Sequence, residues 1–255
     1  MTALFTTRAL VLRRRPYGDY DLIVTLLTWV QGKCTTIAKS AKKSTRRFQG
    51  VLEPFSELTV LCRVGKGMPV LQEATLEAPC DEIRGDVHKT AYASYWTEIV
   101  NIHLEDGQRQ CDLYRLLRFA LTRLHQGGLS SELLSLLFQL RFLKIMGLGP
   151  NLNNCIECHQ ALGDDMAAVY FFDVSQGGVI CPGCRAASAG GIRVSGATIK
   201  QIAWMDRTPV LAAARIRPTP QAYTEGAALL EGFVAYHLGK TPRSLTFLRE
   251  VRAPA

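Results

Sequence analysis

Long apolar runs are missing from this sequence. No stretch approaches the roughly 18 apolar residues that a membrane-spanning helix needs, so we expect no membrane partner. The first apolar stretch, residues 9–12, is short and runs directly into three arginines at positions 13–15. A secretory signal needs a longer apolar segment before its cleavage site. We therefore expect a protein that stays in the cytoplasm.

The sequence also lacks the residue patterns of common catalytic sites. No pair of carboxylates and no Ser/His/Asp set stands out. The turn Gly65-Lys66-Gly67 lacks the glycine spacing and the following helix of a nucleotide loop, so we interpret it as a hairpin turn. The competing interpretation is an enzyme, such as a zinc hydrolase or a thiol oxidoreductase. Such an enzyme would require an open metal position or a cysteine of lowered pKa, so we predict that the protein is not an enzyme.

Acidic residues are scarce at the start of the chain. Residues 1–50 contain ten Lys and Arg but only two acids, Asp19 and Asp21. The net charge of this stretch, +8, equals that of the whole chain, so the remaining 205 residues sum to zero. A concentrated basic surface favours a polyanion, most commonly nucleic acid. A solvated basic face without a partner is the plainer alternative.

Side chains in the first part of the chain alternate between apolar and polar, as they do in β-strands. The expected strands cover residues 5–15, 21–28, 33–40, 51–63 and 68–77. Five short strands in about eighty residues are typical of the oligonucleotide/oligosaccharide-binding (OB) barrel, which we place at residues 1–80. Residues 41–49 offer little to bury, so we expect a solvated basic loop there. Tyr17, Tyr20 and Trp29 either stack on bases or cap the barrel.

From residue 81 onward, apolar residues recur every three or four positions, which predicts helices. The expected helices cover residues 87–102, 113–124, 133–146, 195–206 and 220–238, with a short one from 242. The helix at 133–146 is apolar on nearly every side, so we expect it at the buried centre of a bundle. This bundle is formed by residues 81–150 and 191–255, and the whole chain is a multidomain α+β protein.

Four of the eight cysteines form two Cys-x-x-Cys pairs, Cys155/Cys158 and Cys181/Cys184, separated by 22 residues. Four thiolates in such a pattern bind one structural zinc ion tetrahedrally, which predicts a zinc ribbon inserted at residues 151–190. A redox disulfide and an iron–sulfur cluster are the alternatives. The segment looks too small to bury a core, so we expect metal to supply most of its folding free energy. The other cysteines (Cys34, Cys62, Cys80 and Cys111) are scattered, as expected of buried thiols in a reducing compartment.

Several of these features together resemble a known family. Residues 11–21, with the sequence Val-Leu-Arg-Arg-Arg-Pro-Tyr-Gly-Asp-Tyr-Asp, are followed by Gly32-Lys33 and by Gln49-Gly50-Val51-Leu52-Glu53-Pro54-Phe55. This series, and the order of barrel, helices and cysteine segment, resembles the RecO family of bacterial recombination mediators and DNA repair proteins. Some members of that family lack the cysteines. The resemblance implies binding of single- and double-stranded DNA, annealing of complementary strands, and cooperation with RecR, RecF and the acidic tail of single-strand-binding protein, at the bacterial nucleoid.

The resemblance places DNA contact on basic side chains of the first fifty residues. They are Arg13, Arg14, Arg15, Lys33, Lys39, Lys42, Lys43, Arg46 and Arg47. Lys33 and Lys39 are expected on one face of their strand because side chains alternate with a period of two. No motif identifies the surfaces for RecR or for single-strand-binding protein. An RNA- or ribosome-associated zinc-ribbon protein without annealing activity shares the charge and the cysteine motif, and is the alternative function.

Overall fold

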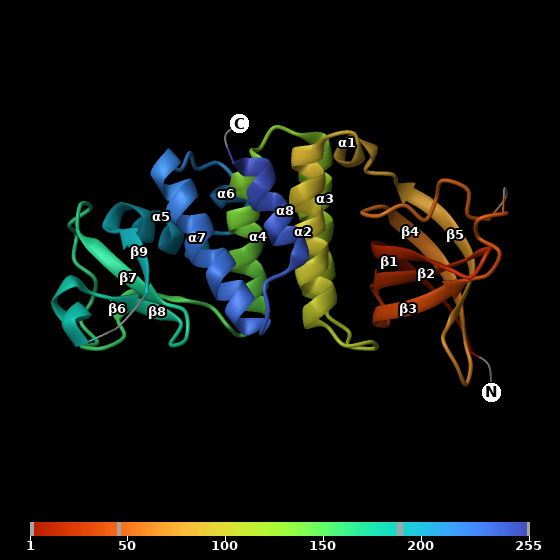
Figure 1. Ribbon diagram of the computed structural model, residues 1–255, viewed down its shortest axis with the longest axis horizontal. Coiled ribbons are helices and arrows are strands. Elements are labelled where there is room, and N and C mark those ends of the chain that lie inside the picture. The colour runs from red at the N-terminus through yellow and green to blue at the C-terminus, as the bar shows by residue number, and fades with distance from the viewer. Residues whose placement is uncertain (1–2, 45–46, 188–190, 254–255) are drawn as a thin grey trace. The chain divides into compact units, whose positions relative to one another are not determined.

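The computed structural model describes residues 3–44, 47–187 and 191–253 (Figure 1). Its elements form two compact units. The first unit runs from the N-terminal strand to Gln126 and includes the residues from Phe247 on, and the second covers Gly127–Thr246. In this described part of the chain, no helix is both long and apolar enough to cross a bilayer.

Five strands of the first unit close into a barrel, as the sequence predicts. They are β1 (Ala3–Tyr17), β2 (Asp21–Thr28), β3 (Gly32–Ala38), β4 (Glu57–Val64) and β5 (Val70–Ala78). Their order around the barrel is β1-β2-β3-β5-β4, and β4 pairs back onto β1. Every pair is antiparallel except β3 with β5. This is the closed five-stranded arrangement of an OB-fold.

The barrel core follows from the alternation of side chains along the strands. In β3, Cys34, Thr36 and Ala38 are buried while the residues between them are half-buried. The same period puts one side of each strand inside the barrel. The buried core comprises Ala9, Val11, Val24, Leu26, Ala38, Ala41, Phe48, Leu52, Leu58, Val60, Cys62 and Leu71.

Two predictions for the connection between β3 and β4 are wrong. First, β4 begins at Glu57 and not at residue 51, because Phe55 has a φ of +73° and its N–H donates to the Val11 carbonyl (2.9 Å). Second, the basic loop is not simply solvated. Phe48, only 4% exposed, and Ala41 both belong to the barrel core. The loop is therefore anchored by its apolar residues, while Lys42 and Lys43 are exposed.

Three helices complete most of the first unit: α1 (Asp81–Arg84), α2 (Val87–His103) and α3 (Cys111–Gln126). The Asp86 carboxylate caps α2 by accepting from the Lys89 N–H (3.1 Å). Val87, which the apolar period puts on the buried face, is 56% exposed because it is the first residue of the helix. In α3 the predicted apolar positions are all buried: Leu113, Leu116, Leu117, Ala120, Leu121 and Leu124.

The turn between β2 and β3 lies directly against the chain that connects α2 to α3. Gly32 has a φ of +70°, and a Cβ there would lie 1.9 Å from the Gln108 carbonyl oxygen, so no larger residue fits. Beside it, the Gly107 N–H donates to the Lys33 carbonyl (2.8 Å). These contacts fix the barrel turn against the start of α3.

The second unit is built on α4 (Ser131–Ile145), which is buried on nearly every side as predicted. Within the unit it packs against α5 (Gly196–Arg207) and α7 (Pro220–His237). The short α6 (Val210–Ala213) follows α5, and α8 (Arg243–Arg252) begins here and continues into the first unit. The sequence did not predict α1 or α6, which have one turn each.

Arg141, on α4, holds the end of α5 in place. Its guanidinium donates to the backbone carbonyls of Met205 and Asp206 (2.8 Å each) and of Thr208. The side chain is only 16% exposed, and burial lowers its pKa. These carbonyls end the helix and have no partner within it, so the arginine replaces missing helical bonds.

We expect Arg141→Met to lower the free energy of unfolding by about 2 kcal/mol, because buried carbonyls lose a charged donor. Chemical denaturation at neutral pH measures the change. The control is Arg215→Met, an exposed arginine in the same unit, which we expect to change stability by less than about 0.5 kcal/mol. Equal stability of the two variants would show that Arg141 contributes nothing at the end of α5.

A four-stranded sheet carries the cysteine pairs. Its strands, in the order β6-β8-β7-β9, are β6 (Asn151–Cys155), β8 (Gly178–Ile180), β7 (Val169–Asp173) and β9 (Ile192–Ser195). β7 and β8 form an antiparallel hairpin, whereas β6 and β9 were not predicted. The expectation that this segment buries no core is wrong. Phe172, Val179 and Ile180 are fully buried, and the Phe172 ring meets Phe233 of α7 edge to face at 5.2 Å.

Candidate nucleic-acid interface and metal centre

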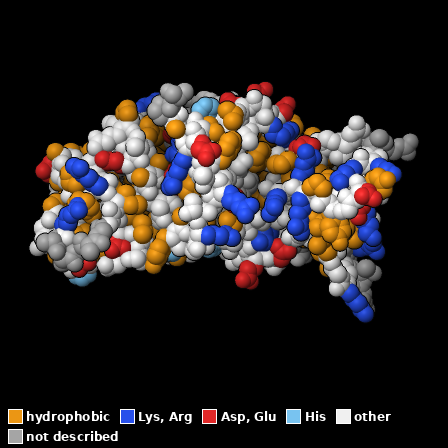
Figure 2. Space-filling model, in the orientation of Figure 1, with side chains coloured by type: hydrophobic (Ala, Val, Ile, Leu, Met, Phe, Trp, Pro, Cys, Tyr) orange, Lys and Arg blue, Asp and Glu red, His pale blue; other side chains and the backbone are white. Residues whose placement is uncertain are grey.

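Basic side chains gather where the basic loop meets the β1–β2 turn. Arg14, Lys42 and Lys43 line one hollow of about 620 Å³ at this end of the barrel. Arg13 and Arg15 lie on the opposite side of β1 and line a smaller hollow with Thr25 and Thr35. Figure 2 shows Lys and Arg side chains over the barrel and over the neighbouring helices. The structure thus divides the predicted residues between two faces of β1.

Lys42, Lys43 and Arg47 are held by neutral groups. Lys42 Nζ donates to the carbonyls of Gly18 (3.1 Å) and Asp19 (3.2 Å), which ties the basic loop to the turn. Lys43 Nζ lies 3.4 Å from the centre of the Tyr20 ring. Arg47 donates to the Lys39 carbonyl (3.2 Å). Since none of these partners is a carboxylate, they leave the positive charges available to an anion.

Two of the predicted residues contact carboxylates. Arg14 pairs with Glu53 at 2.6 Å, but both side chains are partly exposed, and such surface pairs are weak. Lys33 is only 15% exposed, donates to the Asn101 carbonyl (3.0 Å) and lies 3.8 Å from Asp106. Lys33 thus joins the barrel to α2, unlike the exposed Lys39. Arg46 lies outside the described residues. We call Arg14, Lys39, Lys42, Lys43 and Arg47 the loop surface.

A second basic hollow, which the sequence analysis missed, lies between β1 and α3. Arg8, Arg115, Arg118 and Arg123 line it together with aromatic rings, and its volume is about 840 Å³. Behind it, Glu57 is buried and accepts hydrogen bonds from the Tyr114 hydroxyl (3.0 Å) and Arg118 Nε (2.8 Å). Burial and the Glu57 carboxylate raise the pKa of Tyr114, and the bond to Glu57 raises that of Arg118.

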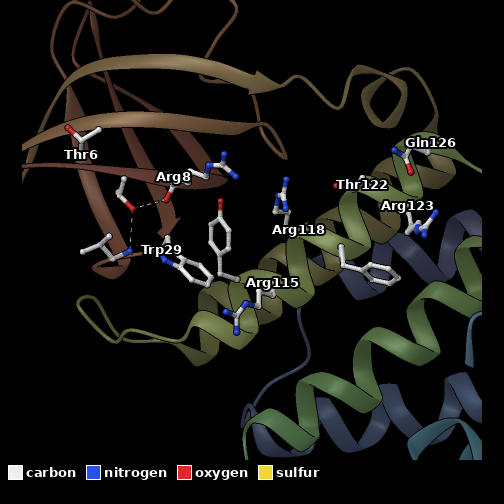
Figure 3. Close-up of a pocket in the computed structure, with 12 residues that line it drawn as sticks. Thr6, Arg8, Trp29, Arg115, Arg118, Thr122, Arg123 and Gln126 are labelled. Atoms are coloured by element: carbon white, nitrogen blue, oxygen red, sulfur yellow. Dashed lines mark hydrogen bonds between the residues drawn. The ribbon is translucent and has the colours of Figure 1, made fainter. Parts of the chain in front are cut away.

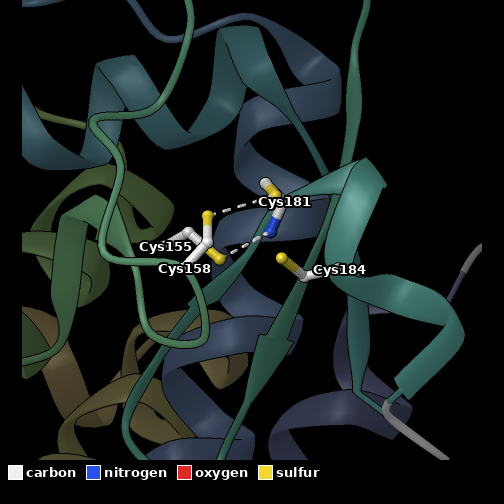
Figure 4. Close-up of side chains that lie close together, drawn as sticks. All are labelled: Cys155, Cys158, Cys181 and Cys184. Carbon is white, nitrogen blue, oxygen red and sulfur yellow. Dashed lines mark hydrogen bonds between the residues drawn. The ribbon is translucent and has the colours of Figure 1, made fainter.

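The four paired cysteines converge as predicted (Figure 4). Their sulfur atoms all lie within 4.8 Å of one another, and the Cys158 and Cys181 sulfurs are 3.9 Å apart. Four thiolates at 2.3 Å from a central ion lie about 3.8 Å apart in a tetrahedron. The cluster therefore has the donor set and nearly the spacing of a four-thiolate metal site.

The thiols of the cluster differ in pKa. Burial opposes ionisation of Cys155, but backbone N–H groups, including that of Cys181 (3.4 Å), outweigh burial and lower its pKa to about 6. Bonding to the Cys181 and Cys158 sulfurs raises the pKa of Cys184 to about 12. A divalent cation at the centre favours the thiolate form of all four, because metal binding displaces thiol protons.

Three of the four remaining cysteines are buried. Cys34 and Cys62 are buried inside the barrel, and burial raises their pKa values to about 11 and about 12. Burial likewise raises the pKa of Cys80 to about 11. Such thiols stay protonated and unreactive near neutral pH. The contrast agrees with a structural role for these three and a ligand role for the paired cysteines.

Comparison with known proteins assigns the N-terminal and C-terminal parts of the chain to the same family. The family model for the N terminal part of recombination protein O matches residues 1–80, and the model for its C terminal part matches residues 84–246. The chain is 41% identical to a DNA repair protein RecO of Desulfatibacillum aliphaticivorans over 250 residues, which are 97% of each chain. It is 38% identical to the protein of that name from Desulfosudis oleivorans, covering 97% of this chain and 98% of the other. This similarity agrees with the OB-fold barrel, the helical body and the four-cysteine cluster, so the chain belongs to the RecO family of DNA repair and recombination proteins.

Proposed function

We propose that this chain is a non-enzymatic mediator that binds single- and double-stranded DNA and anneals complementary strands. It acts with RecR and RecF on DNA coated by single-strand-binding protein, whose acidic tail it contacts, at the nucleoid in the cytoplasm. Residues 1–80 form the DNA-binding domain. The observation that carries the proposal is the loop surface, where Lys42, Lys43 and Arg47 contact neutral groups at and near the β1–β2 turn of an OB barrel.

The mechanism is electrostatic. Two complementary strands repel each other through their phosphates, and each phosphate that meets a Lys or Arg releases condensed counterions. A basic surface lowers the repulsion and holds a strand while the second strand pairs with it. The basic loop suits this role because Phe48 anchors it in the barrel core. Since the contacts are to the backbone, we expect little sequence preference.

The metal in this proposal is zinc, one ion per chain, and its role is structural. Cys155, Cys158, Cys181 and Cys184 supply four thiolates, which complete a tetrahedral shell and leave no position for a reacting water. Bound there, the ion would hold together the ends of β6 and β8, which carry one cysteine of each pair at or next to their last residue. The annealing activity itself involves no chemistry at the metal.

Strand annealing across a salt series tests the proposal. We expect complementary oligonucleotides, bare or coated with single-strand-binding protein, to pair at least about tenfold faster with the protein than without it. The rate should fall steeply as salt rises, because DNA affinity depends on counterion release. ATP should have no effect on the rate. Single-stranded RNA serves as competitor, and a protein that prefers RNA and leaves the annealing rate of DNA unchanged would contradict the proposal.

A further inference from the structure

The hollow between β1 and α3 has the composition of a polyanion site. We call it the α3 hollow, and its twelve lining residues include Arg8, Trp29, Arg115, Arg118, Phe119 and Arg123. The whole lining belongs to the first unit, and none of these described residues carries a carboxylate. Figure 3 shows Arg8 and Trp29 reaching from the barrel, and Arg115, Arg118 and Thr122 projecting from α3. The hollow thus presents hydrogen-bond donors from two sides.

One face of α3 supplies half of this lining. Arg115, Arg118, Phe119, Thr122, Arg123 and Gln126 follow the three- and four-residue spacing that puts side chains on one side of a helix. The opposite face of α3 is the buried apolar one. At 1.5 Å per residue, Arg115 and Arg123 are about 12 Å apart along the axis. This row of cations is long enough to follow several phosphates of one strand.

Aromatic rings hold two of the guanidinium groups. Arg115 lies 4.9 Å above the Trp29 ring and Arg123 lies 5.7 Å from the Phe119 ring. The Trp29 ring also meets Tyr114 edge to face at 5.5 Å, which fixes its orientation. A guanidinium plane or an aromatic ring is a surface on which an unpaired base stacks. The lining therefore combines phosphate donors with base-stacking groups.

The charges of the hollow are only partly neutralised. Arg118 pairs with the buried Glu57, and this pair fixes its position. Arg115 pairs with Asp112 at 2.9 Å, but both side chains are more than half exposed, so the pair is weak. The structure gives no carboxylate partner to Arg8 or Arg123 among the residues it describes, and both are exposed. The net charge available to a ligand is positive.

The α3 hollow and the loop surface lie at opposite ends of β2. The loop surface adjoins the β1–β2 turn, where Lys42 contacts Gly18, whereas Trp29 directly follows the last residue of β2. Eight residues of strand, rising about 3.4 Å each, separate the two places by about 24 Å. They are therefore two sites on one rigid barrel and not parts of one patch.

We propose that the α3 hollow is a second binding site for single-stranded nucleic acid, so that one chain holds two strands at once. This proposal rests on the proposed function and deepens it, because annealing requires that two strands be brought together. One strand lies on the loop surface and the other in the α3 hollow, and the barrel keeps both near each other. An acidic peptide is the alternative occupant, but guanidinium planes and aromatic rings beside threonine hydroxyls match bases and phosphates better.

Binding stoichiometry at low salt tests this proposal. The probe is an oligothymidylate of about four nucleotides, which is too short to span the two sites. The unchanged protein should bind two oligonucleotides. Arg8→Glu with Arg123→Glu should bind only one and should anneal about tenfold more slowly, and Lys39→Glu with Lys43→Glu should also bind one. Arg215→Glu with Arg217→Glu, which changes the net charge equally in the second unit, should still bind two.

Trp29 provides a readout specific to the hollow. Of the three tryptophans, Trp96 is fully buried and Trp204 is in the second unit, so a stacked thymine should quench mainly Trp29. We expect the quenching to disappear in Trp29→Phe and in Arg8→Glu with Arg123→Glu, but to persist in Trp204→Phe.

Three results separate the possible failures. Two bound oligonucleotides and normal annealing in Arg8→Glu with Arg123→Glu would overturn the second site and leave the proposed function standing. Quenching of Trp29 by the acidic tail peptide of single-strand-binding protein, with none by oligonucleotide, would also overturn it and make the occupant a peptide. No binding of any oligonucleotide at low salt would overturn both proposals.

Discussion

Cys181→Ser is expected to abolish tight zinc binding and to destabilise the second unit. A ligand that binds only the folded state stabilises it by about 4 kcal/mol when its concentration is a thousand times its dissociation constant. Loss of one of the four thiolates removes most of this stabilisation. For a protein of this size, the midpoint of thermal unfolding should fall by about 10 °C. Metal analysis of the purified protein should show one zinc ion per chain before the change and none after it.

Hydrogen exchange should show where this stabilisation acts. We expect amides near the cysteine pairs to lose protection, while β7 keeps much of its protection because Phe172 packs against Phe233. The matched control is Cys111→Ser, a half-buried cysteine outside the cluster, which should retain zinc. A Cys181→Ser protein that keeps one zinc ion, or unfolds at the same temperature as the unchanged protein, would disprove the four-thiolate site.

The barrel could be predicted from the sequence because its signal is local. Alternation with a period of two identifies a strand from its own residues, and all five strands were found this way. The start of β4 was missed because Leu52 and Phe55 are buried, as strand residues are, while the left-handed backbone of Phe55 is set by contact with β1. Phe48 was assigned to a solvated loop because neighbouring charges conceal a single buried ring.

The cysteine cluster was predicted from the sequence and the α3 hollow was not, again because only local patterns are visible in a sequence. The cysteine cluster has a sequence signature, since each pair is already close along the chain. The α3 hollow has a weaker one. The spacing of Arg115, Arg118 and Arg123 could have revealed a basic helix face, but the balanced charge of residues 51–255 obscured it. The contribution of Arg8 and Trp29 depends on how the barrel packs on α3, which no local pattern contains.

In the metal segment, β6 and β9 could not be predicted from their local sequence either. The sequence of β6, Asn-Leu-Asn-Asn-Cys, has the composition of a turn. It becomes a strand because it pairs with β8, and its Cys155 faces the other three sulfurs. β9 ends at Ser195, which caps α5, so one residue joins the sheet to the helices. The pairing that defines both strands involves partners 20 or more residues away.

Lys39→Glu with Lys43→Glu is expected to weaken binding of single-stranded DNA about a hundredfold at low salt. Both side chains are exposed, and neither contacts a carboxylate among the described residues, so the fold should remain intact. Removal of two phosphate contacts should also reduce the slope of log affinity against log salt by about 1.4 for single strands. Fluorescence anisotropy with a labelled oligonucleotide measures both quantities, and circular dichroism checks the fold.

The slope distinguishes direct contact from a general effect of charge. Arg215→Glu with Arg217→Glu lowers the net charge by the same amount in the second unit, so it reduces long-range attraction without removing a contact at the loop surface. We expect this control to keep the slope of the unchanged protein and to lose less than about threefold in affinity. If the two double variants show equal slopes and equal affinities, the lysines do not contact phosphate, and the DNA must be bound elsewhere on the protein.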